Sequence, residues 1–278
     1  MSNKLAFVQI TVDRRQLLEN YTSRPHPADD SRVNYIGNTL RNLTRSGLFE
    51  SRTEWTLDII DSGSGPSYAA DFGILDFVGR DPVRVVYHNN GWHRNANQNF
   101  LEAMRVGVAR NAEWVIFIED DIDVIHNFAD GVADWLDDHA KPDTHVYVFG
   151  AACLPGNPKN PGDREKQDGT MWETSQHDGE WTYPPSKFMG TQCIGMRTED
   201  AAAMCEWLSR DKQFVRRAYG YDVEMRKWAE KTYGMDAKFT CTAPSFVQHT
   251  GSESAIHLGR FHVYYSWPGP NWSYKKRV

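Results

Sequence analysis

Cysteine is scarce in this 278-residue chain, and none of it is spaced as a redox or metal motif. Its four cysteines show no C-x-x-C spacing and are too few for a disulfide framework: Cys153, Cys193, Cys205 and Cys241. We therefore expect reduced, mostly buried thiols, as in a cytosolic enzyme.

Long apolar runs are also missing. No segment approaches the roughly 18–20 apolar residues that cross a bilayer. The first residues, Met1 to Leu5, lead straight into a strand-like segment without the basic region and apolar stretch of a signal peptide. The sequence therefore predicts no membrane span and a cytoplasmic location.

The chain has no excess of basic residues. Its net charge is −6 and its pI about 5.9, whereas proteins that bind nucleic acid non-specifically usually carry a basic balance. This argues against a nucleic-acid partner but leaves a local basic patch open.

Strand-like and helical segments alternate over the first 120 residues. The expected strands are 5–12, 55–60, 83–87 and 114–118, and the expected helices are 34–48 and 95–108. This alternation predicts an α/β fold: a doubly wound, mostly parallel sheet with helices on both faces.

The second half is less regular. We expect a strand at 146–151, a long functional loop at 155–185 on the acceptor side, helices at 198–210 and 221–231, and a strand at 238–241. No clean linker divides the chain. We expect one domain over 1–278, with a nucleotide-binding half (1–123) and an acceptor and catalytic half (124–278).

Acidic residues follow two of the expected strands, Asp61 after one and Glu119-Asp120-Asp121 after another. Ligands bind beyond the carboxyl ends of strands in such sheets. Three adjacent carboxylates are costly unless a cation sits among them, and oxygen ligands suit Mg²⁺ or Mn²⁺. The alternative is a solvated turn that caps a following helix through Asp121 or Asp123.

The order of motifs resembles GT-A glycosyltransferases over roughly residues 5 to 257. The matching segments are Thr11-Val12-Asp13-Arg14, Asp61-Ser62-Gly63, residues 91–99, the triplet Glu119-Asp120-Asp121 in place of the family's DxD motif, and P-S-x-x-Q-H-x-G-x-x-S at 244–254. The resemblance implies metal-dependent transfer of a sugar from a nucleotide diphosphate donor. The favoured donor is a UDP-sugar, and the metal is Mn²⁺ or Mg²⁺.

The resemblance also implies which residues contact the donor. Thr11 and Arg14 would border the nucleotide, and Asp61 would accept a hydrogen bond from the base. Arg94 and Asn97 would lie near the diphosphate or ribose, and Glu119 or Asp120 would touch the ribose. Gly190, Thr191 and Gln192 would lie near the sugar. From the residues alone, Asp61 could instead cap its turn and Arg94 could be a surface charge.

For the metal, the resemblance implies Asp121 as the ligand. Asp123 is an alternative because Asp121-Ile122-Asp123 is itself a DxD. His249, expected in a polar turn after a strand, would complete the metal shell or meet the diphosphate. A neutral imidazole favours Mn²⁺, although a lone histidine is more often structural.

Asp222 stands where inverting GT-A enzymes carry the base that deprotonates the acceptor hydroxyl, with Glu224 as second choice. The alternative is that Asp222 is the N-cap of a helix. A retaining enzyme would not need this base.

The acceptor stays open among glycans, lipids, proteins, small metabolites and a hydroxymethylated DNA base. Trp172 and Trp181 could stack on the acceptor, form part of a lid, or anchor the long loop. The aromatic and basic segment 267–277 would suit base stacking, but a tail packed on the sheet is simpler, and DNA is not favoured.

Two other functions compete with sugar transfer. A magnesium-dependent nucleotidyltransferase usually has a glycine-rich basic loop after the first strand, and Thr11 to Arg15 contains no glycine. A non-catalytic carbohydrate-binding protein would not need Asp121, Asp222 and His249 together.

Overall fold

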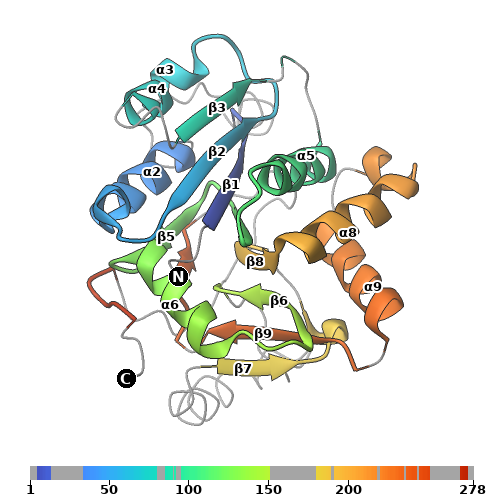
Figure 1. The fold of residues 1–278 in the computed structure, drawn as a ribbon. Helices are drawn as coiled ribbons and strands as arrows, with labels where there is room; N and C mark the ends of the chain where they lie inside the picture. Colours follow the sequence, from blue (N-terminus) through green and yellow to red (C-terminus); the bar gives the residue numbers. More distant parts are fainter. Residues whose placement is uncertain are drawn as a thin grey trace, which may run out of the picture.

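The computed structural model describes residues 5–13, 34–79, 85–89, 91, 95–150, 180–188, 191–217, 220–234, 236–242, 244–250 and 270–274 (Figure 1). Up to the acidic triplet and the short strand behind it, the elements are β1 (Leu5–Thr11), α2 (Tyr35–Arg45), the 3₁₀ turn η1 (Leu48–Glu50), β2 (Trp55–Asp61), α3 (Tyr68–Asp71), α4 (Ile74–Val78), β3 (Val85–Asn89), α5 (Ala96–Ala109), β4 (Trp114–Ile118) and β5 (Ile122–Val124).

The remaining elements are α6 (Phe128–His139), β6 (Thr144–Val148), β7 (Glu180–Tyr183), η3 (Pro185–Lys187), β8 (Cys193–Arg197), α8 (Thr198–Arg210), η4 (Phe214–Arg216), α9 (Tyr221–Tyr233), β9 (Lys238–Thr242) and β10 (Val247–His249). Among all the described residues, from Leu5 to Tyr274, no helix is both long enough and apolar enough to cross a bilayer.

Eight strands form one sheet in the order β3-β2-β1-β4-β8-β6-β9-β7. The pairings of β3, β2, β1 and β4 are all parallel, whereas β8 and β7 run against their neighbours. The expectation of a mostly parallel sheet is therefore confirmed. β5 and β10 form a separate antiparallel pair beside it.

Two hydrophobic cores cover the two faces of the sheet. Neighbouring residues on one strand face opposite cores: Phe7 and Ile116 pack with α2, α4 and α6, while Val8 and Phe117 pack with α5, α8 and α9. Figure 1 shows these two helix layers on either side of the strands. This confirms helices on both faces, because side chains alternate along a strand.

Most predicted elements match, and the longest element that the sequence did not predict is the twelve-residue helix α6. The bounds of α8 are those predicted, and α9 and β9 run slightly longer than expected. The sequence did not predict the helices α3, α4 and α6 or the strands β5, β7, β8 and β10. β7 lies near the end of the predicted loop at 155–185, of which residues 155–179 fall outside the described part of the chain.

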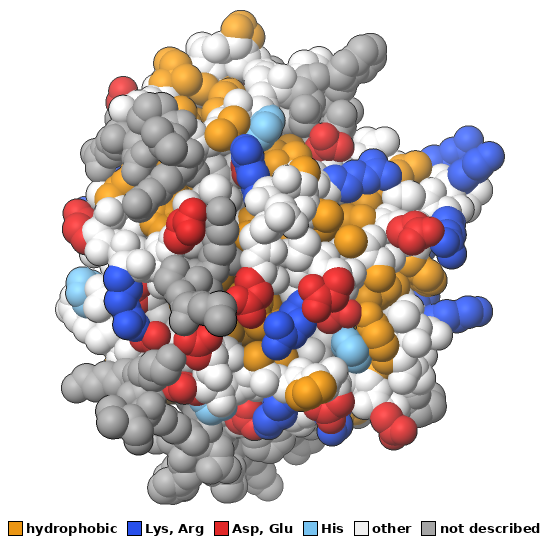
Figure 2. Space-filling model, viewed as in Figure 1, with side chains coloured by type: hydrophobic (Ala, Val, Ile, Leu, Met, Phe, Trp, Pro, Cys, Tyr) orange, Lys and Arg blue, Asp and Glu red, His pale blue; other side chains and the backbone are white. Residues whose placement is uncertain are grey.

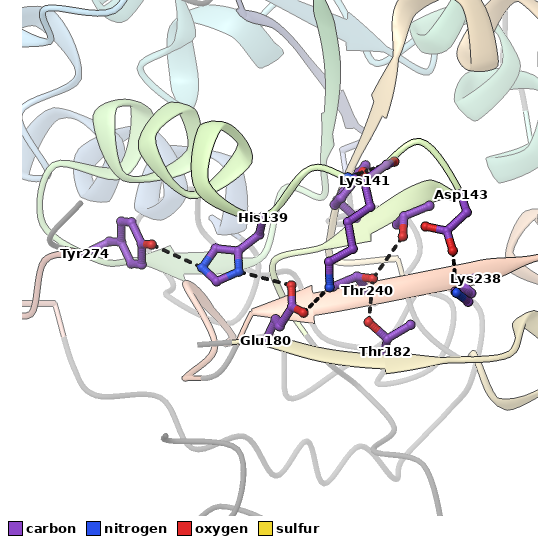
Figure 3. A network of polar contacts seen from close by, with 10 residues as sticks. His139, Lys141, Asp143, Glu180, Thr182, Lys238, Thr240 and Tyr274 are labelled. Atoms are coloured by element: carbon purple, nitrogen blue, oxygen red, sulfur yellow. Dashed lines mark hydrogen bonds and ion pairs between the residues drawn. The ribbon is translucent and has the colours of Figure 1, made fainter. Parts of the chain in front are cut away.

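The outer edge of the sheet is joined to α6 and to the C-terminal segment by polar contacts (Figure 3). His139 Nδ1 lies 3.0 Å from Glu180 Oε2 on β7, and its Nε2 lies 3.3 Å from the Tyr274 hydroxyl. Lys141 pairs with the same Glu180 carboxylate. Tyr274 also packs against Phe246. The tail at 270–274 thus packs on this side of the molecule, as the simpler interpretation of its aromatic residues expected.

Close packing of α5 on the sheet gives a test of this architecture. A methyl group at Gly107 would lie 2.5 Å from Val115 Cγ1 and 3.1 Å from Val8 Cγ1. Overpacking costs about 1–3 kcal/mol, which outweighs or cancels the helix propensity that alanine adds, about 1 kcal/mol. We expect Gly107→Ala to lower the free energy of unfolding in urea by about 1 kcal/mol.

The matched control is Gly65→Ala, because an added methyl group there meets no atom within 4 Å. We expect this variant to unfold like the wild type. A Gly107→Ala protein as stable as the Gly65→Ala protein would show that α5 does not pack on β1 and β4 as described.

Candidate metal and donor site

The carboxyl ends of the central strands meet at one edge of the sheet. In the parallel register Thr11 pairs with Asp61, and Gln9 pairs with Ile118, the last residue of β4. Glu119, which follows β4, therefore lies at the same edge as Thr11 and Asp61.

The turn after β4 is held by neighbouring segments. The backbone N–H of Glu119 donates to the carbonyl of Gln192, which precedes β8, at 2.9 Å. Thr39 on α2 accepts from the backbone N–H of Ile122 at 3.1 Å, and its hydroxyl lies 2.8 Å from the carbonyl oxygen of Asp120. These contacts fix the backbone of the turn that carries the three acidic side chains.

Glu119, Asp121 and His249 converge in the folded chain. One ligand atom from each lies within 4.8 Å of the other two. His249 Nε2 is 3.1 Å from Asp121 Oδ2, and both side chains are less than a tenth exposed. The antiparallel pairing of His249 with Ile122 brings the histidine here from the far end of the chain. His249 ends β10, so the expectation of a turn at this residue is wrong.

The electrostatics of this cluster suit a cation. Burial, and then the charge of Asp121, raise the pKa of Glu119; nearby His249 and hydrogen bonds from Tyr221 and Thr191 act in the other direction. Two carboxylates and an imidazole at this separation fit the donor set of a divalent transition ion. Within the described residues, β5 rather than a helix follows the triplet, so the capping alternative is wrong.

Asp120 points elsewhere, towards β1. It is buried, and its Oδ2 accepts a hydrogen bond from Thr11 Oγ1 at 2.8 Å. The Tyr68 hydroxyl lies 2.5 Å from the same Thr11 oxygen. Thr11 and Asp120, both predicted to contact the donor nucleotide, therefore contact each other. Their contact with a donor stays a prediction.

Asp123 lies outside the three-residue cluster. Its carboxylate accepts a hydrogen bond from the side-chain amide of Asn42 on α2. Burial raises the pKa of Asp123, and Asn42 and Arg45 oppose that shift. Of the two predicted carboxylate ligands, the structure thus brings Asp121 rather than Asp123 to His249.

Asp61 holds the turn after β2. Its two carboxylate oxygens accept hydrogen bonds from Ser64, at 3.0 Å from the backbone N–H and 2.5 Å from the hydroxyl. Gly63 takes the left-handed conformation that this turn requires, with φ 77°. Burial raises the pKa of Asp61. These contacts are those expected if Asp61 caps its turn. A contact between Asp61 and the donor base stays a prediction.

Of the remaining predicted donor residues, the structure describes Asn97 and Gln192. Asn97 is fully buried, and its Nδ2 donates to the carbonyl of Phe214 at 3.0 Å, which ties α5 to η4. Gln192 contributes its carbonyl to the turn of Glu119. The predicted residues that lie outside the described part of the chain are Arg14, Arg94, Gly190 and Trp172; Trp181 belongs to β7, but its side chain is not described.

The start of α9 reaches the cluster. Gly220 is the N-cap, with φ 107°, so Asp222 is not the cap that the alternative required. Asp222 is half-buried and accepts from the N–H of Val223 at 2.8 Å. Glu224 is buried and paired with Arg217 and Lys227 at 2.5 and 2.7 Å. These ion pairs make Glu224 a poorer candidate base than Asp222.

Sequence reasoning did not predict a contact with Glu119 for two residues of this site, Thr191 and Tyr221. The Tyr221 hydroxyl donates to Glu119 Oε1 at 2.7 Å, and Thr191 Oγ1 donates to the same oxygen at 3.0 Å. Tyr221 directly precedes the predicted base, and Thr191 lies between two predicted sugar contacts, Gly190 and Gln192. Their positions beside predicted residues were the available signal.

The face of the molecule in Figure 2 carries both signs of charge. Lysine and arginine side chains lie among aspartate and glutamate side chains over the described residues of this face. Such interspersed charge differs from the basic stripe that follows a nucleic-acid backbone.

Comparison with known proteins identifies the fold. No protein-family model and no curated protein sequence matches the chain. Among solved structures, GalNAc-T7 with UDP, GalNAc and Mn²⁺ has a TM-score of 0.54 at 11% identity, over 90% of this chain and 43% of that one. TarS from S. aureus with UDP-GlcNAc has a TM-score of 0.50 at 12% identity, over 90% and 61%.

A mannosyltransferase from Pyrobaculum calidifontis, PcManGT, solved with GDP-Man and Mn²⁺, has a TM-score of 0.47 at 14% identity, over 88% of this chain and 58% of that one. The chain thus spans less than two thirds of the length of each of these three solved chains. It has the fold of GT-A glycosyltransferases.

The raised pKa of Glu119 predicts how stability depends on pH without metal. The folded-state pKa lies above the ordinary value of 4.5, so the stability contributed by this group is present below pH 4.5 and is lost as pH rises through the folded value. We expect Glu119→Gln to unfold like the wild type near pH 4.5 and to be the more stable protein at pH 7.5.

Urea unfolding in EDTA between pH 4.5 and 7.5 measures this difference. Glu50→Gln, at an exposed position, is the control and should track the wild type throughout. A difference between Glu119→Gln and wild type that does not change with pH would contradict the proximity of Glu119 and Asp121.

Proposed function

We propose that this chain is a divalent-metal-dependent glycosyltransferase, which moves a sugar from a nucleotide diphosphate donor to an acceptor hydroxyl. The observation that carries the proposal is the convergence of Glu119, Asp121 and His249 at the carboxyl edge of a GT-A sheet. In such sheets this edge is where ligands bind. Neither competing function, nucleotidyl transfer or carbohydrate binding alone, gains a specific observation in its favour.

The cation is proposed to be Mn²⁺ or Mg²⁺, with Mn²⁺ favoured by the imidazole ligand. Asp121 and His249 would hold it together with Glu119, which the sequence had suggested as a ribose contact. When bound, the ion would offset the charge that develops on the departing diphosphate. Asp120 and Thr11 then remain as the proposed ribose and nucleotide contacts, and Asp61 as the proposed base contact.

Asp222 is proposed as the base, and the reaction as an inverting single displacement. A carboxylate at this place would take the proton of the acceptor hydroxyl as its oxygen attacks the anomeric carbon. The half-buried position of Asp222, beside the Tyr221 that contacts Glu119, supports this role. Glu224 is set aside because its charge is already offset by Arg217 and Lys227.

A UDP-sugar is the proposed donor. GalNAc-T7 was solved with UDP and TarS with UDP-GlcNAc, at 11% and 12% identity to this chain, and these bound nucleotides support the proposal. The acceptor stays open among glycan, lipid and protein hydroxyls. A hydroxymethylated base in DNA is not favoured, given the net charge of −6.

Two variants separate donor binding from chemistry. Asp121→Asn should remove metal-linked donor binding, because it takes away a ligand. In the wild type, a UDP-sugar at 100 times its Kd should add about 2.7 kcal/mol of stability, and only with Mn²⁺. Asp222→Asn should keep this stabilisation and lower turnover about 10²–10⁴-fold, because it removes only the base.

Thermal shifts with a panel of UDP-sugars and GDP-mannose measure binding, and nucleotide release with Mn²⁺ measures turnover with water as the acceptor. Asp123→Asn is the matched control, since Asp123 bonds Asn42 outside the cluster, and it should bind metal and donor normally. Normal turnover by both Asp121→Asn and Asp222→Asn would overturn the assignment. Stabilisation by nucleoside triphosphates instead of nucleotide sugars would favour nucleotidyl transfer.

A further inference from the structure

Glu119 is held by two hydroxyl groups from separate elements. Tyr221, the first residue of α9, donates to Glu119 Oε1 at 2.7 Å, and Thr191, just before β8, donates to the same oxygen at 3.0 Å. Both donors are buried. Two donors on one oxygen fix the plane of the carboxylate and leave the other oxygen, Oε2, available to a cation.

The Tyr221 ring is fixed independently of its hydroxyl. It stacks on Phe100 with a centroid distance of 4.5 Å and an interplanar angle of 10°, and it meets the edge of Phe117 at 5.9 Å. These contacts lie in the core beneath α5 and α9. The position of the hydroxyl is therefore set by core packing.

Tyr221 also occupies a special place in the chain. Gly220 precedes it in the left-handed conformation that starts α9, and Asp222, the proposed base, follows it. One residue thus connects the carboxylate of Glu119 to the helix that carries Asp222.

We propose that Tyr221 is a positioning residue, an inference that rests on the proposed function. Together with Thr191, Tyr221 orients Glu119 as the third ligand of the divalent cation. Tyr221 also fixes the start of α9 relative to that cation. Hydrogen bonds to ligating groups typically change metal affinity about 10–100-fold when they are removed. The core contacts of the ring survive the change of tyrosine to phenylalanine.

The test is the affinity for Mn²⁺ alone, without nucleotide or turnover, measured from the electron paramagnetic resonance signal of the free ion. We expect Tyr221→Phe to raise the Kd for Mn²⁺ about 10–100-fold, and Thr191→Val to raise it in the same direction. In a Glu119→Gln background, adding Tyr221→Phe should change the Kd less than about twofold, because its target carboxylate is gone.

Tyr147→Phe is the matched control. Tyr147 is equally buried, and its hydroxyl accepts from the N–H of Lys141 at 2.9 Å, away from the cluster. The Tyr147→Phe variant should have a lower free energy of unfolding and an unchanged Kd for Mn²⁺. A purely structural Tyr221 would behave in the same way.

The outcomes separate the two proposals. Wild-type protein that binds no Mn²⁺ overturns the proposed metal site. Wild-type protein that binds Mn²⁺ with the same Kd as Tyr221→Phe overturns the positioning role and leaves the metal site standing. A variant that fails to fold is replaced by Thr191→Val, which must weaken Mn²⁺ binding if the two hydroxyls orient Glu119.

Discussion

The contact between Asp121 and His249 joins the turn after β4 to the strand β10 at the proposed metal site. The two residues are far apart in the chain, yet Asp121 Oδ2 and His249 Nε2 lie 3.1 Å apart with both side chains nearly buried. Bringing a second carboxylate, Glu119, into the same space raises its pKa through burial and the Asp121 charge. Such an arrangement is costly in an empty site and favourable around a cation.

The fold supplies the constraint that keeps these groups together. β4 is a run of five buried apolar residues, and the acidic triplet follows it directly at the carboxyl edge of the sheet. There the β8 segment, α2 and the β5–β10 pair hold the turn. The same edge receives Thr11, Asp61 and the start of α9, which places the proposed nucleotide contacts and the proposed base around one point.

Much of this was readable from the sequence because it rests on local patterns. Alternating apolar strands and amphipathic helices predicted the sheet and both helix layers. The triplet after Ile118 suggested a cation among its carboxylates, and the resemblance to GT-A enzymes added His249 as a proposed ligand. The contacts between Asp121 and His249, and between Glu119 and Tyr221, depend on long-range pairing. No periodicity reveals that β10 pairs with β5, or that a buried tyrosine hydroxyl meets a glutamate about 100 residues away. Asp123, equally suited by spacing, is not part of the cluster and instead accepts a hydrogen bond from Asn42.

The most direct measurement is a crystal structure of the protein soaked with Mn²⁺, with anomalous differences collected at the manganese edge. The account predicts one strong peak with carboxylate oxygens of Glu119 and Asp121 and a ring nitrogen of His249 all within about 2.5 Å. A peak bound by Asp123 without His249, or no peak at this edge of the sheet under saturating Mn²⁺, would contradict it.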